Sequence, residues 1–494
     1  RSLFGMDPSL HHAHSILWHL VTILALWGLL RRLLSPQRAL LGAVIFALHP
    51  LQIEAVALIA ARNDAMAASL AMGALLLVSD RDAPTWKLGL AALLTLLGML
   101  SKETAVLAPV LLLALDTARF GRPQGWHRYA ALGLGVAGFL GMRTAAGVGS
   151  GGLPEPSSWT ILLTQLHEVL GIYGTLLIWP WPLTPARHLA WMPEPAWPFL
   201  VGGAASLGLM ALAVWKGRDR RLVLAGLVWA LAAWAPTILA TVDKGLLGER
   251  YLYFPLAGLA LVVAAAVPNS PRLLAWTALA ALPALVMIEL RLPDWQSSRA
   301  LWTQADEDFP TPFTAGGLAF YVYQDQDFAE AEELFVRAVG GEPPYRDTCT
   351  HLIMVGLAQR DPARAVELGG WGLRERSCPQ IPETMGYYAV ALAGTGRWET
   401  AAGIARRLPA DPFGHQLIVL GAEALHRADF AAYESLKARW RPESSYDEQV
   451  ARVLRMADEG QALMLQQALL DGRIQRLDDP SQPIPEGATV IRSQ

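Results

Sequence analysis

The chain has 494 residues, of which 53% are hydrophobic and only 17% charged, and the charges are densest after Arg291. Its net charge of −3 offers no basic surface for nucleic acid, so nucleic-acid binding is not expected. This composition predicts a membrane part followed by a soluble part.

Apolar runs rich in Leu, Ala, Val and Gly predict a polytopic membrane helix bundle. They cover residues 15–30, 39–61, 65–79, 86–100, 104–118, 129–142, 197–215, 222–241, 251–267 and 273–290. A span needs roughly 20 apolar residues, so the shorter runs must tilt or recruit flanking residues. We therefore assign 1–292 to an all-α membrane domain with ten crossings.

Basic residues fall in every second connection between these runs. They are Arg31, Arg32 and Arg38; Arg81 and Lys87; Arg119, Arg122 and Arg128; Lys216, Arg218, Arg220 and Arg221; and Arg272. By the positive-inside rule these connections face the cytoplasm. The other connections, and everything after Arg291, then face outward.

Three short charged clusters interrupt the apolar sequence on the predicted outer side. They are Arg62-Asn63-Asp64, Ser101-Lys102-Glu103 and Glu249-Arg250-Tyr251. Charges beside hydrocarbon are costly to keep, so they are candidates for function. Because all three clusters reach the same face, we expect Arg62, Lys102 and Arg250 to converge on one outward-facing cavity.

The cationic candidates for this site are Arg62, Lys102, Lys244 and Arg250. Arg suits bidentate phosphate contacts, and Lys acts more as a point charge. The alternative is that these cations neutralise nearby carboxylates in structural pairs. Those carboxylates are Asp64, Glu103, Asp243 and Glu249. Both interpretations stay open for each residue, and the phosphate site is favoured for the group.

Pro50 is expected to break the second run at His49, which would let irregular backbone line a polar cavity. Glu54 then lies about two helical turns before Arg62 on a similar face. Glu54 and Asp64 are the carboxylates that could orient an acceptor or a cation.

His12 and His19 share a helix face. A metal site would need further ligands, and none is evident nearby, so hydrogen bonding within the bundle is favoured over metal binding.

The long connection from Arg143 to Trp197 is rich in Gly, Pro and Trp. Its apolar stretch Trp159–Trp179 is interpreted as an interfacial helix, because a further crossing would reverse the orientation of the basic residues downstream. Trp residues near predicted span ends suit an interfacial belt. They are Trp179, Trp181, Trp191 and Trp197.

A different period begins after a connector, 293–312, and predicts a tetratricopeptide-like α-solenoid over 313–494. Its turns are Asp327-Phe328, Asp361-Pro362, Arg397-Trp398 and Asp429-Phe430, with small residues at Ala331, Ala365, Ala401 and Ala432. A period near 34 residues is typical of paired tetratricopeptide helices. A generic helical solenoid is the alternative.

The chain has two cysteines, Cys349 and Cys378. They fall near the start of one predicted helix and just beyond the end of the next, and antiparallel helices bring such ends together. We predict a disulfide, with Cα atoms about 4.4 to 6.8 Å apart, on the oxidising outer side. Two unrelated buried thiols are the alternative.

Four motifs in this order carry a family resemblance: His49-Pro50-Leu51-Gln52-Ile53-Glu54-Ala55-Val56, Arg62-Asn63-Asp64, Ser101-Lys102-Glu103 and Glu249-Arg250-Tyr251-Leu252-Tyr253-Phe254-Pro255. The chain resembles the transmembrane and tetratricopeptide-containing O-mannosyltransferase family, part of the GT-C superfamily. The segment Trp295 to Trp302 also fits. Ala61 and Ser15 depart from the pattern, because the family often has Gly and Asn there.

The resemblance implies that a sugar, expected to be mannose, moves from a polyprenyl-phosphate carrier to a Ser or Thr hydroxyl of an acceptor protein. It implies a catalytic acidic residue in the first outward loop, which we expect upstream of Arg1 together with one more span. Within the chain the catalytic candidates are Glu54 and Asp64. The substrate-binding candidates are His49, Arg62, Lys102, Glu103, Lys244, Glu249, Arg250 and Tyr253. No cofactor and no metal are predicted.

The predicted location is a bilayer, expected to be a bacterial inner membrane, with the repeats on the periplasmic or outward side and available to protein partners. A membrane-anchored tetratricopeptide scaffold with an inactive transferase half is the alternative to an enzyme. A transporter is a third possibility, but no paired inverted repeat is apparent.

Overall fold

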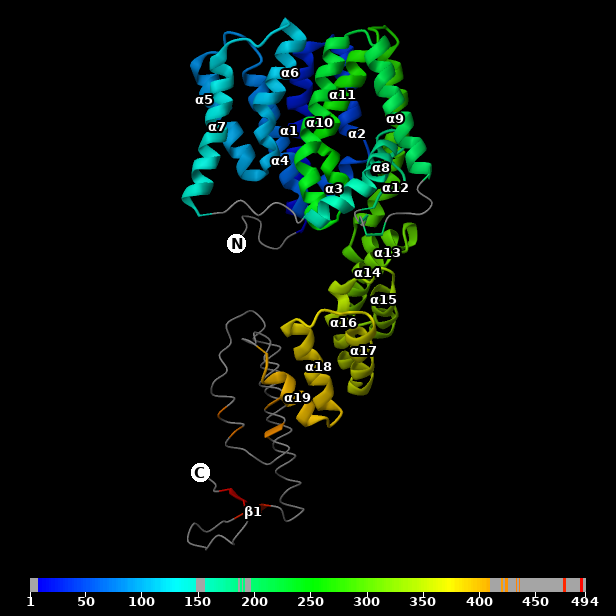
Figure 1. The fold of residues 1–494 in the computed structure, drawn as a ribbon. Coiled ribbons are helices and arrows are strands. Elements are labelled where there is room, and N and C mark those ends of the chain that lie inside the picture. Colours follow the sequence, from blue (N-terminus) through cyan, green and yellow to red (C-terminus); the bar gives the residue numbers. More distant parts are fainter. Residues whose placement is uncertain are drawn as a thin grey trace. The chain divides into compact units, whose positions relative to one another are not determined.

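A computed structural model describes residues 8–147, 156–184, 187–188, 190–191 and 197–408, with short pieces at 419–420, 423–424, 432, 435, 474–476 and 489–491. The chain divides into two compact units, Arg1–Pro310 and Thr311–Gln494, which are treated separately below. The described elements are almost all helices (Figure 1), which confirms the all-α class. The described strands are β1 (Ile474–Arg476) and β2 (Thr489–Ile491), which pair in parallel. The division into 1–292, 293–312 and 313–494 stays a prediction.

The helices of unit 1 follow one another along the chain. They are α1 (Pro8–Leu33), α2 (Pro36–Leu48), α3 (Gln52–Ala57), α4 (Arg62–Leu77), α5 (Thr85–Ser101), α6 (Ala108–Phe120), α7 (Trp126–Ala145), α8 (Pro156–Ile178), α9 (Trp197–Lys216), α10 (Arg220–Lys244), α11 (Tyr253–Ala266), α12 (Leu273–Arg291) and α13 (Ser298–Asp308). Four short 3-10 segments join them: η1 (Ile59–Ala61), η2 (Glu103–Leu107), η3 (Glu249–Leu252) and η4 (Leu292–Trp295).

The helix ends follow from local sequence. Pro36 opens α2, where its missing N–H costs no hydrogen bond. The predicted break at Pro50 is confirmed, because α2 ends at Leu48 and His49 is extended. Gly121 ends α6 in the left-handed conformation, with φ of +77°, which is easily adopted without a Cβ atom.

The long helices of unit 1 run side by side in alternating directions (Figure 1), with the α1–α2, α4–α5, α6–α7 and α9–α10 connections at one end and α3 at the other. Within the described residues four helical segments are long and apolar enough to cross a membrane, namely Pro8–Leu33, Trp197–Lys216, Glu249–Ala266 and Leu273–Trp295. These segments support an integral membrane protein; the count of ten crossings stays a prediction.

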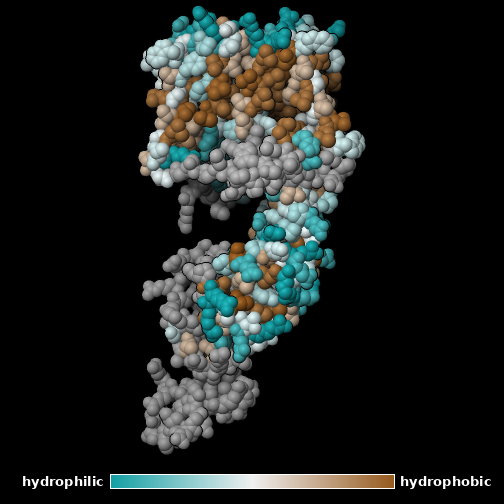
Figure 2. Space-filling model, in the orientation of Figure 1, coloured by the Kyte–Doolittle hydropathy of each residue, from teal (hydrophilic) through white to brown (hydrophobic). Residues whose placement is uncertain are grey.

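The surface of unit 1 fits a bilayer. Figure 2 shows a band of hydrophobic side chains around this unit, with hydrophilic side chains gathered at the end that carries the α1–α2 connection. Large apolar side chains such as Leu207 on α9 and Leu282 on α12 are more than half exposed. Trp179 and Trp197 are also exposed, at 63% and 64%, and both stand at helix ends. Exposed Trp at such positions suits the membrane interface.

Small residues bring the central helices close together. A Cβ atom on Gly258 of α11 would lie 2.6 Å from backbone atoms of α10, so only glycine permits this approach. Gly174 of α8 and Gly203 of α9 meet in the same way. Close backbone contact of this kind is typical of membrane helix packing, where dispersion replaces the hydrophobic effect between helices.

Two of the basic residues assigned to the cytoplasmic connections are buried instead. Arg128 is fully buried and pairs with Asp116 through two contacts of 2.9 and 3.1 Å. Arg38 is 5% exposed, lies 2.6 Å from Asp219 and donates to the carbonyl of Ala264 on α11. These arginines link neighbouring helices through buried contacts. The distribution of basic residues along the sequence does not reveal this role.

Unit 2 is built from three helical hairpins in the described residues. They are α14 (Pro312–Gln324) with α15 (Phe328–Gly340), α16 (Cys349–Ala358) with α17 (Pro362–Glu375), and α18 (Pro382–Gly394) with α19 (Trp398–Ala405); the short η5 (Arg346–Thr348) precedes α16. Each hairpin turns at a residue with positive φ, namely Gln326, Arg360 and Gly396. These positions repeat at 34 and 36 residues, the predicted spacing.

Equivalent positions of the three hairpins have the same structural role. The predicted small residues Ala331, Ala365 and Ala401 are all fully buried, and the Thr350 and Thr384 hydroxyls lie 2.7 Å apart between α16 and α18. The fourth predicted turn, Asp429-Phe430, lies outside the described residues. The tetratricopeptide solenoid therefore stays a prediction.

The predicted disulfide is confirmed. Cys349, the first residue of α16, is bonded to Cys378, which follows α17, and their Cα atoms are 5.8 Å apart. The bond fastens the open end of this hairpin, where the two helices have no turn between them.

Candidate functional site

The charged clusters of unit 1 lie on short elements between the long helices. Glu54 is on α3, Asp64 is in the first turn of α4, and Lys102 lies between α5 and η2. Arg250 and Tyr251 belong to η3, the single turn before α11. Where a membrane helix is interrupted in this way, polar side chains and irregular backbone can line a polar site.

Glu54 and Arg250 form the first ion pair of the site. The carboxylate of Glu54 is fully buried and pairs with the guanidinium of Arg250 through Nη1. The backbone N–H of Arg250 also donates to Glu54 Oε2 at 2.8 Å. One carboxylate from α3 therefore fixes both the backbone and the side chain of a residue 196 positions later.

Asp64 and Lys102 form the second ion pair. The Lys102 ammonium donates to Asp64 Oδ1, and the side chain of Asp64 is 8% exposed. The other oxygen, Asp64 Oδ2, is buried and has no hydrogen-bond partner within the described residues. Leaving a buried carboxylate oxygen without a hydrogen bond costs free energy. Asp64 Oδ2 is therefore a candidate for contact with a ligand or water.

Tyr251 connects the two ion pairs. The Lys102 Nζ atom lies 5.7 Å from the centroid of the Tyr251 ring, and the Arg250 Cζ atom lies 5.1 Å from it. Lys102 and Arg250 are 19% and 24% exposed, whereas the carboxylates that hold them are buried. In this site the cationic groups are therefore partly exposed, and the carboxylates paired with them are buried.

Arg62 has other partners. Its Nη1 atom lies 3.0 Å from His11 Nδ1 and 3.4 Å from His14 Nδ1 on α1. Since Trp18 donates to His14 Nε2 at 2.8 Å, a neutral His14 carries its proton on Nδ1, and His11 is the acceptor that remains for Arg62. The described contacts bring Lys102 and Arg250 together and leave Arg62 against α1.

Glu249 forms a structural pair, the alternative left open for this carboxylate, but its partner is Arg187 rather than one of the four cationic candidates. Its carboxylate accepts from Arg187 at 2.9 Å and from the backbone N–H of Thr184 at 2.6 Å. Arg187 also lies over the ring of Phe309, 5.1 Å from its centroid. Both members of the pair are 2% exposed. The sequence signal for Arg187 is that it is the one Arg or Lys in the Trp- and Pro-rich stretch 179–196.

His49 and Tyr253, two predicted substrate-binding residues, face the interior of the bundle. His49 Nδ1 accepts from the N–H of Leu51, so Nε2 carries the proton and donates to the Leu177 carbonyl at 3.2 Å. Tyr253 is fully buried, and its hydroxyl lies 2.9 Å from His19 Nδ1.

Glu103 and Lys244 are the other predicted substrate-binding residues. Glu103 is exposed and contacts Arg143 at 3.5 Å. Lys244 ends α10, and its side chain lies outside the described residues. Within the part of the chain that the structure describes, no group of three or more His, Cys, Asp or Glu side chains could hold a metal.

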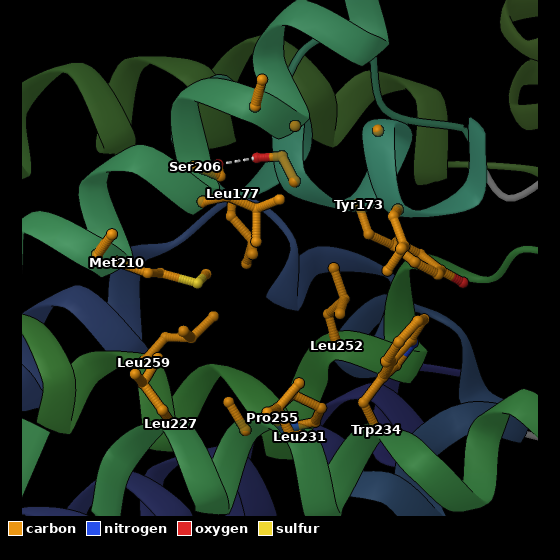
Figure 3. Close-up of a pocket in the computed structure, with 18 of the residues that line it drawn as sticks. Tyr173, Leu177, Ser206, Met210, Leu227, Leu231, Trp234, Leu252, Pro255 and Leu259 are labelled. Atoms are coloured by element: carbon orange, nitrogen blue, oxygen red, sulfur yellow. Dashed lines mark hydrogen bonds between the residues drawn. The ribbon is translucent and has the colours of Figure 1, made fainter. Parts of the chain in front are cut away.

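An apolar cavity of about 580 Å³ lies between the α8–α9 hairpin and the α10–α11 hairpin. Figure 3 shows Tyr173, Met210, Trp234 and Leu252 around it. The hydroxyl of Ser206, a polar group in the cavity wall, donates a hydrogen bond to the carbonyl of Gly174. The cavity is therefore suited to a hydrocarbon chain rather than a sugar.

The cavity adjoins the ion pairs through η3. Leu252, which lines the cavity, directly follows Tyr251. The hydroxyl of Tyr173, another lining residue, donates to the carbonyl of Gly248 at 3.2 Å, just before η3. The short turn η3 thus carries both Arg250, one cation of the site, and Leu252, one of the residues that line the cavity.

A family model described as dolichyl-phosphate-mannose-protein mannosyltransferase matches residues 2–140. The match covers α1 to most of α7 and includes Glu54, Asp64 and Lys102. No curated protein and no solved structure matches the chain. The family match supports a membrane glycosyltransferase of the mannosyltransferase type.

Proposed function

We propose that the protein moves a sugar, mannose by family expectation, from a polyprenyl-phosphate carrier to a Ser or Thr hydroxyl of an acceptor protein. The observation that carries this proposal is the pairing of Lys102 and Arg250 around Tyr251, next to an apolar cavity. A polyprenyl-phosphate sugar has the same two parts, an anionic head and a hydrocarbon tail.

The reaction explains why two cations are useful. The acceptor oxygen attacks the anomeric carbon, the bond from that carbon to the phosphate oxygen breaks, and the acceptor proton passes to a carboxylate. The leaving polyprenyl phosphate gains one negative charge as this bond breaks. Lys102 and Arg250 would stabilise that charge at a membrane boundary, where electrostatic interactions are strong.

Glu54 and Asp64 support the cations in this proposal. Each is buried and bound to one of them, so each fixes the position of a cation. The family resemblance implies that the carboxylate that accepts the proton belongs to the first outward loop of such an enzyme. The helical repeats of unit 2 would hold the acceptor protein or other partners on the outward side.

The proposal is tested by sugar transfer in proteoliposomes that contain the protein and a labelled polyprenyl-phosphate mannose. Arg250→Ala and Lys102→Ala should each lower kcat/KM by roughly 100-fold, the usual cost of losing one group that stabilises transition-state charge. Arg122→Ala, an exposed arginine at the opposite end of the bundle, is the matched control and should transfer normally. Normal transfer by both site variants would contradict the proposal.

A membrane-anchored repeat scaffold is the second candidate. The observation that favours it is that Glu54, Asp64 and Glu249 are each neutralised by a cation, as in a structural network. A scaffold needs no polyprenyl phosphate. If the protein does not bind this lipid, the result would favour the scaffold.

A further inference from the structure

The ring of Tyr251 has two cationic side chains close to it. It is 7% exposed, so its ring is held within the bundle, yet Lys102 and Arg250 both lie within 6 Å of its centroid. They reach the ring from distant parts of the chain, Lys102 from the end of α5 and Arg250 from η3. No sequence motif indicated that one aromatic ring would serve both.

Two cations that lie near the same ring repel each other, and each of these has a carboxylate of its own. Lys102 is paired with Asp64 and Arg250 with Glu54, so the ion pairs hold each cation to a different carboxylate. An aromatic face attracts cations through its negative quadrupole. A ring in contact with both therefore offsets their repulsion and holds them as neighbours.

We propose that Tyr251 is a positioning residue that holds Lys102 and Arg250 as one paired receptor for the phosphate of the lipid carrier. This inference rests on the proposed function and adds the group that sets the spacing of the two cations. A phosphate has several oxygens, so it can accept from both cations at once only if they stay side by side. The ring itself touches no reacting atom.

A purely structural Tyr251 would fill space in the core, and its shape alone would matter. A ring that acts through its quadrupole is sensitive to electron density as well. Fluorination withdraws density from the face and nearly preserves the shape, so it separates the two roles.

The experiment measures binding of labelled polyprenyl monophosphate, and of the uncharged polyprenol with the same tail, to the full chain in detergent. The variants are Tyr251→Leu, Tyr251→Phe and position 251 replaced by mono- and trifluorinated phenylalanine. Trp215→Leu is the matched control, because Lys216 lies over that exposed ring, 4.8 Å from its centroid, on α9. Lys102→Ala and Arg250→Ala test the underlying site.

Tyr251→Leu should weaken binding of the phosphate lipid about tenfold and leave polyprenol binding unchanged. Tyr251→Phe should restore most of the affinity, and each fluorination should lower it again. Trp215→Leu should bind both lipids normally.

Three results would overturn the inference or its basis. If Tyr251→Leu binds the phosphate lipid normally while Lys102→Ala does not, the positioning role is wrong and the phosphate site stands. If fluorination has no effect, or if both lipids weaken equally, the ring acts by packing alone. If Lys102→Ala and Arg250→Ala both bind normally, the proposed function itself fails.

Discussion

At the scale of single residues, buried ion pairs hold the ends of the bundle together. Asp116 of α6 accepts from Arg128 and from the Tyr129 hydroxyl of α7, and from the N–H of Gln124. Arg128 also donates to the Val78 carbonyl at the end of α4. Burying two charges costs solvation free energy. The ion pair offsets this cost only when the remaining polar atoms of both groups have hydrogen-bond partners, as they do here.

We therefore expect Arg128→Ala to destabilise the protein strongly, by about 3 to 5 kcal/mol, because it leaves the Asp116 carboxylate buried and uncompensated. Thermal unfolding in detergent measures this loss. Arg122→Ala, an exposed arginine of the same connection, should change little. The double variant Arg128→Met/Asp116→Leu should recover part of the loss; a double variant as unstable as Arg128→Ala would contradict the explanation.

Residue contacts of this kind were the least predictable part of the chain. The sequence identified Glu54, Asp64, Lys102 and Arg250 as candidates because charge stands out in an apolar context. It did not pair them, since the partners Glu54 and Arg250 are 196 residues apart. Arg187 was missed for the same reason, because only folding brings it to Glu249.

At the scale of elements, the breaks and turns were predictable because their signals are local. Pro50 ends α2, and the turns of the helical hairpins recur at the period read from the sequence. Packing between elements was not predictable. The cavity between the α8–α9 and α10–α11 hairpins depends on how two helix pairs meet, which no local pattern records.

Helix α16 carries a histidine that should make unit 2 sensitive to acid. The ring of His351 stacks on Phe335, with centroids 5.6 Å apart, and burial lowers the pKa of His351 from its ordinary 6.5. Between these two pKa values the unfolded chain binds more protons than the folded chain, so stability falls as pH drops below about 6.5. The loss levels off below the pKa of the folded state.

Hydrogen exchange of the α16 amides in the intact chain, corrected for intrinsic exchange rates, should show weaker protection at pH 5 than at pH 7.5. His351→Phe keeps an aromatic ring in the stack and removes the titrating group, so its protection should be less sensitive to pH. Equal acid sensitivity in the variant would show that another group is responsible.

The disulfide should stabilise the hairpin of α16 and α17. The bond joins residues 29 positions apart, and constraining a loop of this length in the unfolded chain stabilises the folded state by about 3.6 kcal/mol. The double variant Cys349→Ser/Cys378→Ser should lower the unfolding temperature of unit 2. Reductant should shift the unmodified protein in the same direction and leave the double variant unchanged; free thiols in protein from the native membrane would contradict the bond.

At the scale of the whole molecule, the two ends of unit 1 differ in chemistry. Basic residues gather at the end with the α1–α2 and α9–α10 connections, and the Lys102–Arg250 site lies on breaks between helices. The positive-inside rule predicts that the basic end faces the cytoplasm and that the connections at the other end open to the opposite compartment. This arrangement is a property of the whole chain, because one extra crossing would reverse everything after it.

Labelling in sealed membrane vesicles tests this arrangement. Glu103→Cys places a thiol at a residue whose side chain is 67% exposed, and Arg122→Cys places one at an exposed residue of the basic connections. Because Cys349 and Cys378 are bonded to each other, each variant adds a single reactive thiol. A maleimide that cannot cross membranes should label only Glu103→Cys from the outside and only Arg122→Cys from the cytoplasmic side. Both should react once detergent opens the vesicles, which shows that the two thiols are accessible. Labelling of both from the same side would place the cation site and the basic connections in one compartment, and an outward-facing transferase would then be excluded.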